Sequence, residues 1–170
     1  MNNPNYPERL LSACHYQNAL IADLISAFKY DGLRELVEPC CEILSRFFRD
    51  EHLELPQNWI MTSVPIDARK KEQRGFNQSE LIARQFANSQ NIDYKNLLEK
   101  QRVTKNQMKL DRKDRQTNLS EAFTATQTCA GKNIILFDDV ITTGSTLLEC
   151  TKELKKADAN KIIWLTLARD

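Results

Sequence analysis

The sequence lacks any apolar run long enough to cross a membrane, because such a span needs about 20 consecutive apolar residues. Its polar start, Met1-Asn2-Asn3-Pro4, does not resemble a secretory signal peptide. We therefore expect a cytoplasmic protein without membrane insertion. The 170 residues, 41% of them apolar, suit one globular domain over residues 1–170 with a core of its own.

Paired cysteine motifs are also missing. The five cysteines show no Cys-x-x-Cys spacing, which argues against both a zinc site and a disulfide framework. The two histidines, His15 and His52, are interpreted as surface residues rather than metal ligands. Unpaired thiols agree with the reducing cytoplasm.

The chain as a whole has no large excess of positive or negative charge, since its net charge is +1. This argues against a protein that is basic throughout and binds nucleic acid by charge alone, but it permits local basic patches. Two such patches are present. Residues 69–74 hold four basic residues and one acid, and residues 100–118 hold seven basic residues and two acids.

What the sequence does contain is an apolar run that ends in two aspartates and a hydroxyl-rich turn. Residues 134–137 are typical of a buried strand. Asp138 and Asp139 follow, and apolar residues at helical spacing begin at Leu147. The pattern predicts a strand, an acidic pair, a short loop and a helix. In open α/β sheets such a turn lies at the carboxyl edge, where ligands bind.

The residues of this turn suit a ribose 5-phosphate. The free amides and the dipole at a helix start attract phosphate, and Gly144 allows the backbone to approach it. The carboxylates of Asp138 and Asp139 would repel phosphate, but they accept hydrogen bonds from sugar hydroxyls or bind a divalent cation. The alternative is an aspartate pair that only caps the next helix, although capping needs a single aspartate.

Residues 137–146 resemble the phosphoribosyl pyrophosphate (PRPP) motif of the type I phosphoribosyltransferases. The resemblance implies an α/β fold with a central, mainly parallel sheet flanked by helices and with a flexible hood loop. It implies that the acidic pair holds the ribose hydroxyls, serves catalysis and meets Mg²⁺ indirectly through PRPP. The PRPP-binding residues that it implies are Asp138, Asp139, Val140, Ile141, Thr142, Thr143, Gly144, Ser145 and Thr146.

The first third of the chain predicts a helical layer over residues 1–50. We expect a short helix around residues 8–14, a helix over 17–30, and a helix over 33–48 that kinks or restarts at Pro39. Lys29 could reach a ligand near the Asp31-Gly32 turn. The favoured interpretation is a lysine that lies along its own helix.

Two more strands are predicted at residues 59–64 and 161–170, and the order strand, helix, strand over 133–168 predicts a parallel crossover. After the strand that ends at Pro65 we expect a basic loop, then a helix capped by Asn77 with Glu80. The loop could hold a second anion or be only a solvated run of charge. Residues 100–118 are predicted to be a hood loop over a polyphosphate, with a solvent-facing basic arm as the alternative.

Three further groups of residues resemble the ComF family, phosphoribosyltransferase-like proteins linked to natural competence, the uptake of DNA by bacteria. They are residues 29–32, residues 74–78 and spaced positions between Leu97 and Phe123. The resemblance implies that Arg69, Arg74 and Gly75 face the pyrophosphate, and that Arg102, Gln107 and Lys109 belong to the hood. Many relatives carry an N-terminal cysteine-rich zinc module that this sequence lacks, so the role of that module does not transfer.

Three functions fit the sequence. The first is a phosphoribosyltransferase that uses PRPP with Mg²⁺ and releases pyrophosphate, whose developing charge Mg²⁺ and fixed cations would stabilise. The second is an accessory of the DNA uptake machinery that binds single-stranded DNA, and the third is a regulator that binds PRPP or a nucleotide without turnover. The acceptor, the oligomeric state and direct DNA binding cannot be read from the sequence.

Overall fold

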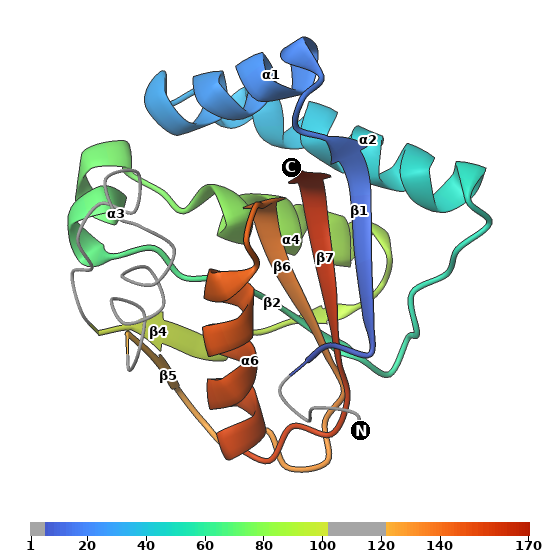
Figure 1. The fold of residues 1–170 in the computed structure, drawn as a ribbon, viewed down its shortest axis with the longest axis vertical. Coiled ribbons are helices and arrows are strands. Elements are labelled where there is room, and N and C mark those ends of the chain that lie inside the picture. The colour runs from blue at the N-terminus through green and yellow to red at the C-terminus, as the bar shows by residue number, and fades with distance from the viewer. Residues whose placement is uncertain (1–5, 102–121) are drawn as a thin grey trace.

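The computed structural model describes residues 6–101 and 122–170. Its centre is a sheet of five parallel strands in the order β1-β7-β6-β2-β3 (Figure 1). The α/β fold with a parallel central sheet is therefore confirmed. The strands are β1 (Arg9–His15), β2 (Ile60–Ser63), β3 (Asp93–Tyr94), β6 (Ile134–Ile141) and β7 (Ile162–Arg169).

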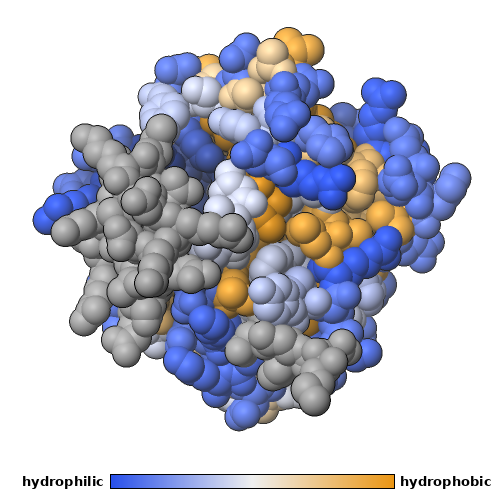
Figure 2. All heavy atoms as spheres, in the orientation of Figure 1, coloured by the Kyte–Doolittle hydropathy of each residue, from blue (hydrophilic) through white to orange (hydrophobic). Residues whose placement is uncertain are grey.

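Helices cover both faces of this sheet and enclose two cores. On one face, α1 (Ala19–Tyr30), α2 (Val37–Asp50) and α4 (Gln78–Ser89) pack together. On the other face lie α6 (Ser145–Lys156) and a small antiparallel sheet of β4 (Leu98–Lys100) and β5 (Phe123–Ala125). Hydrophilic side chains cover most of the face seen in Figure 2, apart from an apolar patch over β1 and β7.

Strand β6 explains the apolar run of the sequence. Consecutive side chains of a strand point to opposite faces, so Ile135 and Phe137 enter one core while Ile134 and Leu136 enter the other. All four are fully buried. The strand continues through both aspartates and ends at Ile141, so the acidic pair lies on the sheet itself rather than in the loop beyond it.

Two expectations for the helical layer are wrong. The segment predicted as a helix around residues 8–14 is strand β1, which pairs with β7 from Arg9 opposite Ile163 to His15 opposite Arg169. The second helix does not restart at Pro39. A 3₁₀ turn, η1 (Arg34–Leu36), comes first and α2 begins at Val37, which places Pro39 in the first helical turn, where its missing amide has no partner to lose.

The basic segment after β2 is not a loop, because residues 68–74 form the helix α3 (Ala68–Arg74). The carboxylate of Asp67 accepts a hydrogen bond from the Lys70 amide at 3.0 Å, and Gly75 ends the helix with a φ of 75°. The helix α4 begins after Asn77, which occupies the N-cap position as predicted, but the expected side-chain capping bond is wrong. Asn77 makes no side-chain cap bond and donates instead from Nδ2 to the Val64 carbonyl oxygen at 3.0 Å.

Across the described ranges, no helix has both the length and the apolar character that a membrane span requires. All five cysteines are free thiols. The hood residues Arg102, Gln107 and Lys109 lie outside the described residues, in the stretch between β4 and β5.

Truncating the centre of β6 should destabilise the fold strongly. Leu136→Ala empties space in a fully buried position, so we expect a loss of about 2–5 kcal/mol in the free energy of unfolding, measured with urea. The matched control is Leu20→Ala on α1, since Leu20 is 79% exposed and should change stability by less than about 0.5 kcal/mol. An equal loss in both variants would contradict this account of the core.

Candidate functional site at the carboxyl edge of the sheet

A cavity of about 290 Å³ opens where β2 and β6 end. It draws its walls from segments far apart in the sequence. From β6 and the loop after it come Asp138, Asp139, Val140, Thr142 and Thr146. The segment from β2 to α4 supplies eight more, which are Val64, Pro65, Ile66, Asp67, Lys70, Arg74, Gln78 and Ser79. The remaining wall residues are Lys29 and Tyr30 of α1, Lys100 of β4 and Phe123 of β5.

The two aspartates are held by different partners. One carboxylate oxygen of Asp138, Oδ1, accepts hydrogen bonds from Ser79 Oγ at 3.0 Å and from the Asp139 amide at 2.9 Å. Asp139 accepts from the Val140 amide at 2.8 Å, and its Oδ2 forms an ion pair with Lys29 Nζ at 2.8 Å. Among the described residues, Asp138 Oδ2 has no hydrogen-bond partner and is left for a ligand.

The pKa of Asp138 is raised to about 7. Burial is the largest cause and the neighbouring charge of Asp139 adds to it, while Lys29 and the hydrogen bonds from the Asp139 amide and Ser79 act in the opposite direction. Burial lowers the pKa of Lys29, but its attraction to Asp139 and Asp138 outweighs burial, and the net pKa is raised. Lys29 therefore stays charged beside Asp139, while Asp138 can carry a proton near neutral pH.

The interpretation of Lys29 as lying along its own helix is wrong. Its ammonium crosses from the end of α1 to the acidic pair on β6, and only 24% of its side chain is exposed. The one signal in the sequence was the position of Lys29 at the end of a helix, beside the Asp31-Gly32 turn.

The start of α6 and the loop before it contribute to the wall of the cavity. Gly144 precedes the helix with a φ of 72°, a left-handed backbone conformation that favours glycine over residues with a Cβ. Thr142 and Thr146 line the cavity. Of the other predicted PRPP residues, Ile141 is buried in the core, and Thr143, Gly144 and Ser145 are outside the cavity lining.

A cationic wall comes from α3 and β4. Lys70, Arg74 and Lys100 line the cavity, and burial together with the nearby charge of Lys70 lowers the pKa of Lys100. Sequence reasoning named Arg74 as a site residue, and it placed Lys70 in the basic segment 69–74 and Lys100 in the segment 100–118 without naming either lysine as a site residue. Arg69, which it also named, is exposed on α3 and is not among the lining residues, and neither is Gly75.

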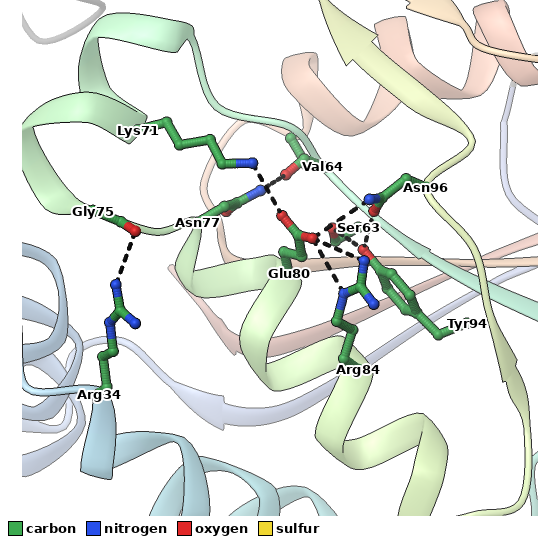
Figure 3. A network of polar contacts seen from close by, with 10 residues as sticks. All are labelled: Arg34, Ser63, Val64, Lys71, Gly75, Asn77, Glu80, Arg84, Tyr94 and Asn96. Carbon is green, nitrogen blue, oxygen red and sulfur yellow. Dashed lines mark hydrogen bonds and ion pairs between the residues drawn. The ribbon is translucent and has the colours of Figure 1, made fainter.

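The N-terminal layer braces the end of α3. Phe28 and Phe76 lie with ring centroids 5.5 Å apart, and the guanidinium of Arg34 is 5.0 Å from the Phe76 ring. Arg34 Nη2 also donates to the Gly75 carbonyl oxygen at 2.9 Å (Figure 3). The backbone of Gly75 is therefore used to join α3 to η1.

A polar network fixes the other side of the β2–α4 segment (Figure 3). The Glu80 carboxylate contacts Arg84 at 3.1 Å, Asn96 at 3.4 Å and Lys71 at 3.7 Å. The Tyr94 hydroxyl lies 2.8 Å from Ser63 Oγ. Glu80 thus ties α3, α4 and the chain after β3 together, instead of closing a capping box.

Comparison with known proteins gives the family. Residues 72–170 match the model of the phosphoribosyl transferase domain. The chain is 32% identical to Competence protein F of Haemophilus influenzae, over 95% of this chain and 73% of that protein. It is 28% identical to DNA utilization protein YhgH of Escherichia coli K12, over 92% of this chain and 70% of the relative.

Among solved structures, adenine phosphoribosyltransferase from Leishmania donovani aligns with 99% of this chain and 85% of its own, at 14% identity and a TM-score of 0.47. The domain match covers more than half of the chain, and the competence relative aligns with nearly all of it. The chain therefore belongs to the ComF family and carries a phosphoribosyl transferase domain.

Proposed function

We propose that the protein binds PRPP with Mg²⁺ in this cavity and transfers the phosphoribosyl group to an acceptor, with release of pyrophosphate. One observation carries the proposal. Two adjacent carboxylates, the threonine-rich start of a helix and, besides Lys29, three cations line a single cavity. The carboxylates suit the ribose hydroxyls, the helix start suits the 5-phosphate, and the cations suit the pyrophosphate.

The cations act on the leaving group. As the bond from ribose C1 to pyrophosphate breaks, negative charge gathers on the pyrophosphate, and fixed positive charge in the cavity stabilises it. Lys70, Arg74 and Lys100 are the candidates for this role. Contacts of Arg69 and Gly75 with the pyrophosphate stay a prediction.

Magnesium would enter with PRPP. Within residues 6–101 and 122–170, no three acidic, histidine or cysteine side chains gather into a metal site. Asp138 and Asp139 fit a ribose that carries a bound ion, since Asp138 keeps one oxygen without a partner and carboxylate oxygens are the ligands that Mg²⁺ prefers. Bound Mg²⁺ would neutralise charge on the phosphates.

We further propose that this activity serves DNA uptake or DNA utilization, on the strength of the names of the two relatives. Binding without turnover is the second candidate. Apart from the acidic pair, the only carboxylate among the described lining residues is Asp67, which caps α3 and leaves no evident general base. Release of pyrophosphate, measured with a panel of nucleobases and amines, separates the transferase from a sensor.

Removing both carboxylates should abolish tight binding of PRPP. We expect Asp138→Asn/Asp139→Asn to weaken binding at least about 100-fold, because two hydrogen bonds to charged acceptors are lost. Titration calorimetry with Mg²⁺ and PRPP measures the change. The charge-matched control is Asp23→Asn/Asp93→Asn at two exposed positions, and weakening of the same size in the control would refute the assignment.

The two arginines of α3 should contribute differently to the binding of pyrophosphate and PRPP. Arg74 lines the cavity and Arg69 is exposed away from it. We expect Arg74→Ala to weaken binding of pyrophosphate and PRPP by about 10- to 100-fold, the loss typical of a hydrogen bond to a charged group. Arg69→Ala should change it by less than about threefold. The reverse ranking, measured by the same titration, would show that the pyrophosphate lies elsewhere.

Binding of PRPP should strengthen as the pH rises through 7. The pKa of Asp138 is raised to about 7, so the ionised form that accepts sugar hydroxyls is scarce below this pH and dominant above it. Between pH 6 and pH 8 the fraction ionised grows about 10-fold, and affinity should follow. The control is Asp138→Asn, which keeps only the pH dependence of the PRPP phosphates, so identical profiles for the two proteins would count against the role of Asp138.

A further inference from the structure

Tyr30 is the aromatic side chain that this cavity offers to a ligand. Two aromatic residues line the cavity within the described part of the chain, Tyr30 and Phe123. Phe123 is only 2% exposed, whereas Tyr30 is 70% exposed at the end of α1. Its ring therefore presents a large accessible surface at the edge of the site.

The ring is held beside a cation. The guanidinium of Arg74 lies 5.6 Å from the centroid of the Tyr30 ring, within the range of a cation–π contact. Arg74 is itself fixed, because its Nη1 donates to Gln78 Oε1 at 3.2 Å. Lys29, the neighbour of Tyr30, is fixed by Asp139. An exposed aromatic ring beside cations suits a planar ligand that also carries phosphate.

This wall lies outside the part of the chain that matches the phosphoribosyl transferase domain. That match begins at residue 72, while Lys29 and Tyr30 belong to the N-terminal layer. The domain match can explain a sugar-phosphate site, but Tyr30 is an addition that this chain brings from its N-terminal layer. A separate recognition task is the natural use of such an addition.

We propose that the exposed ring of Tyr30 is a stacking platform for a nucleobase at the mouth of the cavity. Stacking on tyrosine is open to every base, because each has a flat π surface. The base could belong to a free nucleotide or to single-stranded DNA, since the contact is the same in both. The free-nucleotide case rests on the proposed function, because its ribose phosphate would occupy the PRPP site, whereas the DNA case does not depend on it.

The test compares probes that differ only in the base. One pair is an oligothymidylate of about 12 nucleotides and an abasic oligonucleotide of equal length. The other pair is AMP and ribose 5-phosphate. In the wild-type protein the base-bearing member of at least one pair should bind about 5- to 150-fold more tightly.

Substitutions of Tyr30 then test whether the base stacks on this ring. Tyr30→Leu should reduce that preference to about onefold, while Tyr30→Phe keeps the ring and should preserve it. The matched control is Tyr6→Leu, a 58% exposed tyrosine near the start of β1 at the opposite edge of the sheet. Loss in the oligonucleotide pair identifies single-stranded DNA as the source, and loss in the AMP pair identifies a free nucleotide.

Three results would overturn the proposal: no base preference in the wild type, a preference that survives in Tyr30→Leu, or its loss in Tyr30→Phe. The calorimetric titration of PRPP is a separate measurement. If PRPP fails to bind, the proposed function falls while the oligonucleotide comparison still stands. If PRPP binds and Tyr30→Leu keeps the base preference, only the stacking platform falls. Thermal melting of each variant shows that the fold is retained.

Discussion

Two neighbouring carboxylates at the end of a buried strand repel one another, and much of the site can be understood as the means of holding them there. Lys29 neutralises Asp139, while Ser79 and two backbone amides donate hydrogen bonds to Oδ1 of Asp138 and Oδ1 of Asp139. Removing a single partner would leave a half-buried charge uncompensated, at a cost of several kcal/mol. The acidic pair therefore requires α1 and α4 to be in place, and the helical layer is part of the site as well as of the core.

The same constraint explains why the cavity is electrically mixed. Its floor is acidic and its sides are basic, so neither sign dominates. A ligand that carries hydroxyls in its middle and phosphates at its ends matches this distribution better than a simple anion or a simple cation does. The protein achieves this with a net charge of only +1, since charge is placed locally rather than accumulated.

The parts of the fold that the sequence predicts correctly are those with a strong local pattern. Strand β6 is buried on both faces, and its sequence begins with an unbroken run of apolar residues. The helices α1, α4 and α6 each carry buried residues at helical spacing. The elements that the sequence predicts wrongly lack such a pattern. Strand β1 lies at an edge of the sheet and buries only Leu11 fully, and α3 buries none of its residues and owes its shape to Asp67 and Gly75.

Apart from Arg74, the candidate site could be predicted only where it is continuous in sequence. The acidic pair and the loop after it stand together, and Asp138, Asp139, Thr142 and Thr146 all reach the cavity. Lys29 and Lys100 reach it through the fold, because each meets the end of β6 from an element distant in the chain. No local property of a lysine distinguishes one that crosses to another element from one that stays on its own helix.

The bracing of α3 by Phe28 and Arg34 bears on where this chain could be cut. A fragment that begins with the matched region at residue 72 would have neither β2 beside β6 nor β1 beside β7. It would also expose the apolar faces of α4 and β6 that α1 and α2 now cover. The region that matches the phosphoribosyl transferase domain is thus smaller than the unit that can fold, and an isolated C-terminal fragment would present open sheet edges and bare apolar surface to its neighbours.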